Sequence, residues 1–491
     1  MINSTIIQDE CKINLTNDQK NALDKLLEFI YNKDNTILIE GYAGTGKTTL
    51  ITLLIPYLLK NNIIKSVVFS APTNKAVNVI IEKYPIQKNK DIIVDFLTIH
   101  KLLKYKSEFN NEGNKIFVKS EGSCFKLYDL IIIDECSMLS KDIVKNIGEE
   151  INEKTKIILI GDPAQLPPVN EDYSSIFTKF KNKVLLQQVV RAKKQGIVEA
   201  CNNTRRMIFD ETQQEVKEVD GIYFYRNNYE KKREQNIVID FSEYVVKTKW
   251  FKKYLEIEDS IILAWTNKQV SMYNEEIRRI KFGKKLKKYL VGDKLILTDY
   301  YLTNDDYTEP IYTSEQITII GVQETNIKFP EMVCKFEGIT KEMKKIANNY
   351  INLINSGTIR QYNVYKLKIK KSNNLIFTIY VLKDIDIKKN TQDQEYAKEK
   401  IYKFIKKYGS DEMIEKNIIR IMWKYYNKTF VDPFAKINYG YSTTVHKSQA
   451  SSYKNVFVDY NDIIKNKNTL EALHCLYTAQ SRAINSLHML V

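Results

Sequence analysis

The sequence predicts an α/β fold with two parallel β-sheets, each covered by helices, a β-hairpin inserted in the first half and a β-rich insertion in the second. Two observations predict the sheets. Short apolar runs alternate with helical stretches between residues 15 and 165, and the same alternation returns at residues 260–264 and again near residue 455. A third observation, alternation of apolar residues with lysines within residues 300–430, predicts the β-rich insertion.

The predicted strands are short runs of mainly β-branched and other apolar residues. In the first half they are Thr36–Glu40, Ser66–Ser70, Leu130–Ile133 and Lys156–Ile160, and in the second they are Ser260–Ala264, Asn455–Asp459 and Ser486–Val491. Such nearly continuous apolar runs are typical of strands that are buried on both faces, as in parallel sheets. The chain is therefore expected to form two α/β units.

Two segments interrupt this pattern. In residues 104–124, the turn residues Asn110–Asn114 precede a strand-like run, Lys115–Lys119, which predicts a protruding hairpin. In the second half, Tyr365–Lys370 alternates apolar residues with lysines and Leu375–Val381 follows after a short turn, which predicts a two-faced hairpin. We expect a helix to follow it, because apolar residues recur at helical spacing from residue 397 and Gly409 is placed to end the helix.

Composition and charge restrict the class of protein. The 491 residues are 43% hydrophobic and 27% charged, and they contain no apolar run near the roughly 18 residues of a membrane span. The N-terminus lacks the basic start and apolar core of a secretory signal, so we expect an intracellular protein without membrane partners, in the cytoplasm of a prokaryote or an infected host cell. The formal charge of +15 and the pI of about 9.1 favour a phosphate-rich partner, although AT-rich coding also enriches lysine.

The most specific motif is Gly41-Tyr-Ala-Gly-Thr-Gly46-Lys47-Thr48, which matches the phosphate-binding pattern G-x-x-x-x-G-K-[ST]. It follows a predicted strand and precedes an apolar helical run, Thr49–Ile55, as this motif requires. Backbone N–H groups and one ammonium then surround the phosphates of a nucleotide. The candidate nucleotide-binding residues of this loop are Gly41, Ala43, Gly44, Thr45, Gly46, Lys47, Thr48 and Thr49.

A pair of acids follows the third predicted strand. Asp134 and Glu135 come directly after Leu130–Ile133, where a parallel sheet presents its carboxyl edge to a bound ligand. Asp134 is the candidate Mg²⁺ ligand together with the Thr48 hydroxyl, and Glu135 is the candidate general base that activates water. The alternative is an ordinary strand end with solvated acids.

The fourth predicted strand ends in a turn that is rich in proline. Three of the nine prolines of the chain lie within residues 163–168, and they flank Gln165. Because proline fixes φ, this turn would hold the amide of Gln165 in a set direction, suited to sensing a γ-phosphate. Considered alone, the segment could equally be a plain proline-rich turn.

The three segments GYAGTGKTT, IIIDECS and GDPAQLPPV, in this order, resemble motifs I, II and III of superfamily 1 helicases. The resemblance implies further site residues. Gln19 lies in a run similar to the Q motif, which reads adenine, although Thr16 and Gln19 also form the pattern of a helix capping box. Gln187–Arg191 resembles motif IV and Leu476–Ala483 resembles motif VI, which implies catalytic roles for Arg191 and Arg482 at the γ-phosphate.

The same resemblance implies contacts with nucleic acid. Segments similar to motifs Ia, Ib and V contain the candidate residues Pro72, Thr73, Asn74, Thr98, His100, Thr443, Thr444, His446, Lys447 and Ser448. Helix N-termini such as the one predicted after Thr73 bind phosphates readily. In the motif V segment, Ala450 stands where the family has glycine, and this departure could stiffen the loop.

Within the superfamily, the chain looks most like the Dda, RecD and Pif1 group. This resemblance implies two RecA-like domains, a short pin in the first and an SH3-like insertion in the second. The implied domains are a first RecA-like domain (1–188) with the pin at 104–124, a second RecA-like domain (189–299 and 432–491) and the SH3-like insertion (300–431). Phe117 in the pin is a candidate wedge that stacks on bases at a fork, or else a core residue of the hairpin.

The implied activity is that of an ATP-dependent DNA helicase that uses ATP and Mg²⁺, moves 5′ to 3′ on single-stranded DNA and opens forked duplexes, as a monomer. Replication, repair or recombination proteins are further candidate partners. Two alternatives stay open at this level. One is an RNA-dependent NTPase of viral type, and the other is a nucleic-acid clamp or recruitment subunit whose affinity is switched by hydrolysis.

Overall fold

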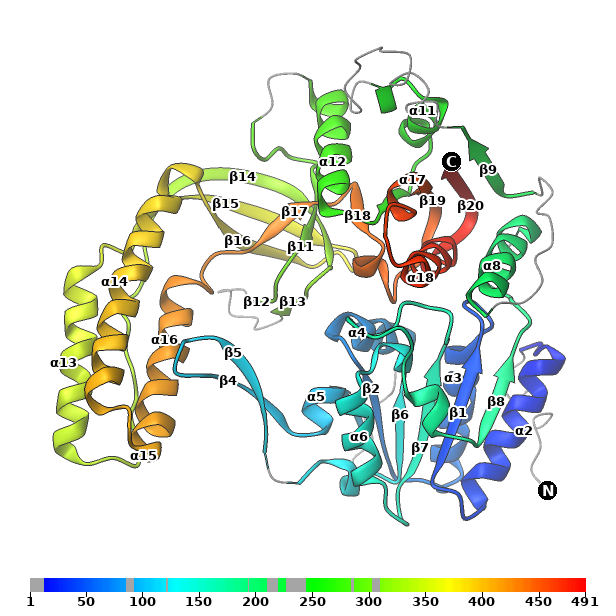
Figure 1. Cartoon of the computed structure of the whole chain (residues 1–491), viewed down its shortest axis with the longest axis horizontal. Coiled ribbons are helices and arrows are strands. Elements are labelled where there is room, and N and C mark those ends of the chain that lie inside the picture. Colours follow the sequence, from blue (N-terminus) through cyan, green and yellow to red (C-terminus); the bar gives the residue numbers. More distant parts are fainter. Residues whose placement is uncertain are drawn as a thin grey trace. The chain divides into compact units, whose positions relative to one another are not determined.

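The computed structural model describes residues 13–84, 92–120, 122–192, 194–209, 220–226, 244–283, 287–302 and 310–491 (Figure 1). The chain divides into two compact units. Unit 1 comprises residues 1–104, 121–284 and 441–491, and unit 2 comprises residues 105–120 and 285–440.

The first sheet of unit 1, called here the N-terminal sheet, is parallel throughout. Its strands, in spatial order, are β3 (Ile93–Thr98), β2 (Ser66–Ala71), β6 (Leu130–Ile133), β7 (Lys156–Gly161), β1 (Thr36–Gly41) and β8 (Lys183–Leu186). The four predicted strands are confirmed, with ends that differ by at most one residue. The two edge strands β3 and β8 were not predicted, because an edge strand is only partly buried and lacks the continuous apolar run.

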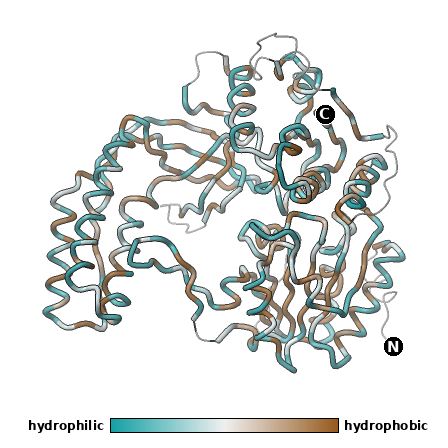
Figure 2. Tube along the Cα trace, viewed as in Figure 1, coloured by the Kyte–Doolittle hydropathy of each residue, from teal (hydrophilic) through white to brown (hydrophobic). Residues whose placement is uncertain are grey.

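Helices connect and cover these strands. They are α2 (Asn17–Tyr31), α3 (Lys47–Lys60), α4 (Asn74–Lys83), α5 (Ile99–Leu102), α6 (Lys141–Glu150) and α7 (Ile176–Lys179). The apolar faces of α2, α3 and α4 pack with the strands in one buried core, and Figure 2 shows hydrophobic residues concentrated along the strands. The capping box predicted at Thr16 and Gln19 begins α2.

The second sheet of unit 1, called here the C-terminal sheet, is also parallel. Its strands, in spatial order, are β18 (Ser442–Thr444), β10 (Ser260–Ala264), β19 (Tyr453–Asp459), β20 (Ala483–Leu490) and β9 (Ile222–Tyr225). The helices of this half are α8 (Gln195–Ile208), α11 (Lys249–Glu256), α12 (Asn267–Phe282), α17 (Tyr460–Ile463) and α18 (Thr469–Gln480). The α/β fold class with two parallel sheets is therefore confirmed.

Residues of the first half of unit 1 contribute to the core of the second half. Ala164 and Leu166, which follow the last residue of β7 in the N-terminal sheet, are buried among the apolar side chains of α8, α18 and the C-terminal sheet. The turn that carries Gln165 is thus held by residues from both halves.

Unit 2 contains an antiparallel sheet. Its strands, in spatial order, are β16 (Ile376–Leu382), β15 (Gln361–Lys371), β14 (Gln316–Lys328), β11 (Lys294–Leu297) and β17 (Ile437–Tyr439), beside a small pair, β12 (Tyr301–Leu302) and β13 (Pro310–Ile311). The hairpin predicted from alternating lysines is β15–β16, and buried residues alternate with more exposed ones along it. The SH3-like character of this insertion stays a prediction.

The expectation of a β-rich insertion needs a correction, because much of unit 2 is helical. Its helices are α13 (Lys341–Gly357), α14 (Asp384–Tyr408), α15 (Glu412–Ile414) and α16 (Arg420–Phe430), with one π-helical turn at Glu415–Ile419. Only α14 was predicted. The helices bury their apolar faces against one another in a core that includes Trp423 and Phe404. This core is separate from that of the sheet.

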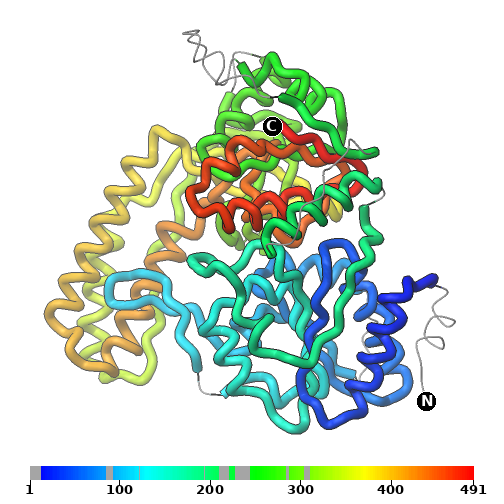
Figure 3. The backbone as a smooth tube through the Cα atoms, turned by 45° about the vertical axis from the view of Figure 1, so that its right-hand side comes forward, coloured from blue at the N-terminus to red at the C-terminus, as the bar shows by residue number. Residues whose placement is uncertain are grey.

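The hairpin predicted within residues 104–124 is formed by β4 (Tyr105–Phe109) and β5 (Lys115–Lys119). It belongs to unit 2, and Figures 1 and 3 both show it beside α16. Glu108 forms an ion pair with Arg420 of α16, and the hydroxyl of Tyr402 in α14 donates a hydrogen bond to the backbone oxygen of Glu112 at 2.9 Å. The hairpin is therefore anchored to helices that follow it by about 300 residues in the sequence.

The turn of this hairpin lies against an aromatic ring. Gly113 has a φ of +78°, and a Cβ atom there would lie 2.7 Å from the ring of Trp423. Gly292, also in unit 2, has a φ of +90° but no atom near the corresponding Cβ position. The two glycines therefore share the backbone requirement, and only Gly113 is crowded.

We predict that Gly113→Ala lowers the free energy of unfolding of unit 2 by about 2 kcal/mol more than Gly292→Ala does, because the added methyl group displaces Trp423. Urea unfolding followed by tryptophan fluorescence measures the difference. Equal effects of the two substitutions would show that the hairpin does not pack on α16.

Candidate active site

The loop Gly41–Gly46 joins β1 to α3 and has a backbone that requires glycine. Gly44 and Gly46 have φ values of +82° and +84°. A Cβ atom on Gly44 would lie 2.8 Å from Cβ of Arg191, and one on Gly46 would lie 2.4 Å from Nε2 of Gln19. The left-handed conformation disfavours larger residues at both positions, and crowding by Cβ of Arg191 adds to this at Gly44. The predicted nucleotide-binding residues thus lie together, in this loop and the first turn of α3.

Lys47 is the first residue of α3. Its ammonium donates hydrogen bonds to the backbone oxygens of Gly41 (2.7 Å) and Tyr42 (2.8 Å). Burial lowers the pKa of Lys47, whereas the nearby charges of Asp162, Glu135 and Asp134 act in the opposite direction. The ammonium thus lies among acids and is held by carbonyl groups that a phosphate could replace.

Asp134 and Glu135 follow β6 at the carboxyl edge of the N-terminal sheet. Glu135 adopts a left-handed conformation (φ +53°), and its N–H donates to Oδ1 of Asp134 at 2.8 Å. Burial, and secondly the charge of Glu135, raises the pKa of Asp134 to about 6. Two neighbouring carboxylates that are costly to ionise together form a site that favours a divalent cation.

Gln165 lies in the turn after β7 and is only 5% exposed. Its Oε1 atom is buried and has no hydrogen-bond partner among the described residues. A buried acceptor without a partner is unfavourable, and a water molecule or ligand hydroxyl would satisfy it. This arrangement suits the predicted sensing role.

Arg191 lies near the two acids, and Arg482 lies near Arg191. The N–H groups of Val190 and Arg191 donate to the backbone oxygen of Gly44 at 2.8 and 2.9 Å, so this segment covers the phosphate-binding loop. Burial, and secondly the charge of Arg482, lowers the pKa of Arg191, whereas Glu135 and Asp134 raise it. Arg191 thus approaches the acids and Lys47, and Arg482, from a segment nearly 300 residues away in the sequence, approaches Arg191.

Arg482 itself is 2% exposed and is held by its own half of unit 1. Its guanidinium donates to the backbone oxygens of Thr478 (3.0 Å) and Ser451 (3.2 Å). Ala450, next to Ser451, has a φ of +60°, a conformation that disfavours a residue with a Cβ atom. The departure from glycine at this position therefore places strain beside the backbone that holds Arg482.

Gln19 contacts the phosphate-binding loop directly. Its Oε1 accepts from the N–H of Thr16 at 3.0 Å, and its Nε2 donates to the backbone oxygen of Thr45 at 2.9 Å. The capping role is confirmed, and reading of adenine by Gln19 stays a prediction. The preceding residue, Asp18, accepts hydrogen bonds from the N–H groups of Gln187 and Gln188 at 3.0 Å each, which fixes the segment leading to Arg191.

Several predicted nucleic-acid residues begin helices. Thr73, between Pro72 and Asn74, caps α4 by accepting from the N–H of Ala76 at 3.2 Å, and Thr98 caps α5 by accepting from the N–H of Lys101 at 3.4 Å. His100 lies within α5, and burial lowers its pKa. Each threonine side chain thus satisfies one N–H group at the helix N-terminus, and phosphate binding by these segments stays a prediction.

In the segment resembling motif V, the predicted residues differ in exposure. Thr443, Thr444 and Ser448 are buried, and the Ser448 hydroxyl donates to the backbone oxygen of Val445 at 2.7 Å. Burial lowers the pKa of His446, whose side chain is 40% exposed. Lys75 of α4 donates to the backbone oxygen of Lys447 at 3.0 Å, which connects this segment to the one that contains Thr73. In this conformation the buried hydroxyls support the backbone and do not reach the surface.

Phe117, the remaining predicted nucleic-acid residue, belongs to unit 2. It is on β5, opposite Ser107, and is 56% exposed. A half-exposed ring is compatible with stacking on a base, so its role as a wedge stays a prediction.

Comparisons with known proteins now add to this geometry. A family model described as an AAA domain matches residues 14–222. An uncharacterized protein of Acanthamoeba polyphaga mimivirus is 32% identical, over 96% of this chain and 99% of that protein. The RecBCD enzyme subunit RecD of Buchnera aphidicola subsp. Schizaphis graminum is 25% identical, over 97% of this chain and 73% of that subunit. The ATP-dependent DNA helicase dda of Enterobacteria phage T4 is 26% identical, over 62% of this chain and 67% of that protein. The chain belongs to the superfamily 1 helicases, with RecD and Dda among its relatives.

As a member of this family, the protein is an ATP-driven nucleic acid helicase. The assignment of the N-terminal and C-terminal sheets of unit 1 to two RecA-like domains stays a prediction. Within the part of the chain that the structure covers, no helix has the length and apolar character needed to span a bilayer.

The sequence analysis did not identify Arg205 of α8, which pairs with Asp162 and stacks on the ring of Tyr42 in the phosphate-binding loop. Its position carries a detectable signal, because Arg205 follows Ile197 and Cys201 at intervals of four residues on the buried face of α8. A cation on an apolar helix face predicts a buried partner. Asp18 gave no comparable signal, since its position in the first turn of α2 already explains an acid.

We predict that Asp134→Asn stabilises the helicase against unfolding at pH 8 in the absence of Mg²⁺, by about 1–3 kcal/mol. The raised pKa of Asp134, about 6 against the ordinary 3.8, means that the folded state binds this proton more tightly than the unfolded state does. Ionisation of the carboxyl therefore costs stability above pH 6 and costs none once both states are protonated, near pH 3.

Urea unfolding at a series of pH values measures this effect, and Asp142→Asn, an exposed acid on α6, is the control. If the free energy of unfolding gained by Asp134→Asn does not decrease toward acid pH, the prediction is contradicted.

Proposed function

We propose that this helicase acts on DNA, translocates 5′ to 3′ on single-stranded DNA and unwinds duplex DNA at the expense of ATP. The observation that carries this proposal is the proximity of Arg191 to Lys47 and to the acids Asp134 and Glu135, with Arg482 near enough to act on Arg191. Cations and carboxylates from separate segments suit a bound triphosphate, and they would make hydrolysis depend on how closely those segments approach.

The proposed roles follow from this arrangement. Lys47 leaves the oxygens of Gly41 and Tyr42 to bind phosphate, and Glu135 orients and deprotonates the attacking water. The unpartnered Oε1 atom of Gln165 accepts a hydrogen bond from that water. Arg191 and Arg482 stabilise the charge that develops on the γ-phosphate.

Mg²⁺ fits the acids beside the loop. Asp134, whose ionisation is unfavourable without a counter-ion, and the Thr48 hydroxyl in the first turn of α3 would hold the ion. When bound, Mg²⁺ would neutralise part of the charge of the phosphates. Gln19 and the loop residues Gly41–Thr49 are the proposed contacts for the rest of the nucleotide.

The proposed path for DNA runs along the segments that contain Thr73, Thr98 and Thr443–Ser448. The hydrogen bond from Lys75 to the backbone oxygen of Lys447 supports a shared surface for the first and last of these segments. The formal charge of +15 supports a phosphate-rich partner. DNA as the substrate and 5′-to-3′ movement come from the resemblance to the Dda group, whose phage T4 member is named a DNA helicase.

The proposed domain boundaries lie at residues 188, 299 and 431, and the proposed pin at residues 104–124. We propose that the protein acts as a monomer on forked DNA. Phe117 is the proposed wedge.

We predict that Lys47→Ala lowers kcat for DNA-stimulated ATP hydrolysis by about 100-fold or more, because the phosphates lose their nearest cation. A coupled ATPase assay with and without single-stranded DNA measures the change. Lys60→Ala, at the opposite end of α3, is the matched control and should resemble the unmodified protein. Full turnover by the Lys47 variant would refute the site assignment.

We predict that a duplex with only a 5′ single-stranded tail is unwound and that one with only a 3′ tail is not. A strand-displacement assay with the two tailed substrates measures the polarity, and the reverse preference would contradict it. Stimulation by RNA in place of DNA would favour an RNA-dependent enzyme, and DNA binding without strand displacement would favour a clamp.

A further inference from the structure

Arg205 is a buried cation outside every segment assigned so far. It lies on the apolar face of α8 and is 7% exposed. Burial alone would lower its pKa, but the charge of Asp162, its hydrogen bond to Arg205 and the nearby Tyr477 and Tyr42 together raise the pKa. Burying a guanidinium is costly unless it is fully paired, so the position of Arg205 is set by its partners.

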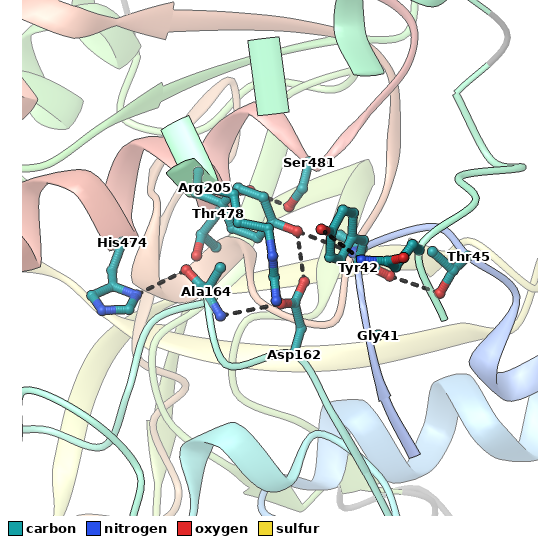
Figure 4. A network of polar contacts seen from close by, with 12 residues as sticks. Gly41, Tyr42, Thr45, Asp162, Ala164, Arg205, His474, Thr478 and Ser481 are labelled. Carbon is teal, nitrogen blue, oxygen red and sulfur yellow. Dashed lines mark hydrogen bonds and ion pairs between the residues drawn. The ribbon is translucent and has the colours of Figure 1, made fainter. Parts of the chain in front are cut away.

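The main partner is Asp162, the residue after β7, which is itself buried. Nη1 of Arg205 lies 2.5 Å from Oδ1 of Asp162. The same carboxylate accepts hydrogen bonds from the Tyr477 hydroxyl of α18 at 2.7 Å and from the N–H of Ala164 at 3.1 Å. One carboxylate thus joins α8, α18 and the turn that carries Gln165 (Figure 4).

The second partner is the phosphate-binding loop. Cζ of Arg205 lies 4.1 Å from the centre of the Tyr42 ring, a cation–π contact. The backbone oxygen of Tyr42 is one of the two acceptors that hold Lys47, and the N–H of the next residue, Ala43, donates to the Tyr477 hydroxyl at 3.1 Å. The contacts therefore close a ring from Tyr42 through Arg205, Asp162 and Tyr477 back to the loop.

Helix α18 meets the same turn at two further points. Nδ1 of His474 lies 2.8 Å from the backbone oxygen of Ala164, and the N–H of Leu166 donates to the Thr478 hydroxyl at 3.1 Å. The backbone oxygen of Thr478 in turn accepts from Arg482 at 3.0 Å. The ring is thus continuous with the helix end that holds Arg482.

We propose that Arg205 is a positioning residue that couples nucleotide binding at the loop to the placement of α18 and Arg482, through Tyr42 on one side and Asp162 on the other. This inference rests on the proposed function. When Lys47 moves from the Tyr42 oxygen to a phosphate, the Tyr42 backbone loses a hydrogen bond, and Arg205 links the Tyr42 ring to the turn and to α18. Lysine would keep the charge opposite Asp162 but lacks the planar group that stacks on Tyr42.

We predict that Arg205→Met lowers kcat for DNA-stimulated ATP hydrolysis by about tenfold while KM for ATP changes by less than about threefold, because the phosphate-binding groups remain and the alignment of Arg482 is lost. Arg205→Lys should have an intermediate kcat. The control is Arg206→Met, the neighbouring residue, whose guanidinium donates to Asn203 of the same helix at 3.3 Å and which should match the unmodified protein.

A double variant tests the route through the loop. Tyr42→Ala should lower kcat in the same way. Adding it to Arg205→Met should lower kcat by less than about a further twofold, because each substitution breaks the same contact between Arg205 and Tyr42. Losses of kcat that multiply in the double variant would overturn the inference. Thermal unfolding gives the folded fraction of Arg205→Met, and an unchanged kcat per folded molecule in this variant would overturn it as well.

The outcomes also separate this inference from the proposed function. If the unmodified protein shows no DNA-stimulated hydrolysis, the proposed function fails. If the unmodified protein does show DNA-stimulated hydrolysis, and the Arg205 and Tyr42 variants hydrolyse ATP as fast as it does, the inference fails and the proposed function stands.

Discussion

Unit 1 depends on the burial of opposite charges around the phosphate-binding loop. Lys47, Arg191 and Arg482 would each be unfavourable if desolvated alone, and Asp134 is already harder to ionise than a free aspartate. The charges of Asp134 and Glu135 reduce the cost of burying Lys47 and Arg191, whereas Arg482 increases it for Arg191. A bound polyanion would offset the repulsion between the two arginines.

The loop gains its shape from its surroundings as much as from its glycines. Gly44 and Gly46 permit left-handed conformations, but the backbone oxygen of Gly44 is occupied by the Arg191 segment and that of Thr45 by Gln19. A loop held in this way loses little conformational entropy when a ligand binds. The same contacts join Arg191 and the loop in one structure.

Arg205 and Asp162 add a second buried pair that differs in kind from the first. Their charges neutralise each other and leave no excess for a ligand. Breaking such a pair leaves an uncompensated charge, so the pair favours joint movement of the elements that carry it. Unit 2 shows a comparable device at its surface, where the ion pair between Glu108 and Arg420 joins the hairpin to α16.

The sequence by itself determined the buried strands, the phosphate-binding loop and the two acids after β6, because each depends on a short run of residues whose pattern is local. It also indicated the group of helicases through the order of such runs. The tertiary structure alone decided the pairing of Arg205 with Asp162, the anchoring of the Arg191 segment by Asp18, the burial of Thr443 and Ser448, and the packing of the hairpin on α16. These contacts join residues separated by about 40 to 300 positions, and no local periodicity records them, since they arise only when separate elements pack and their buried polar groups must find partners.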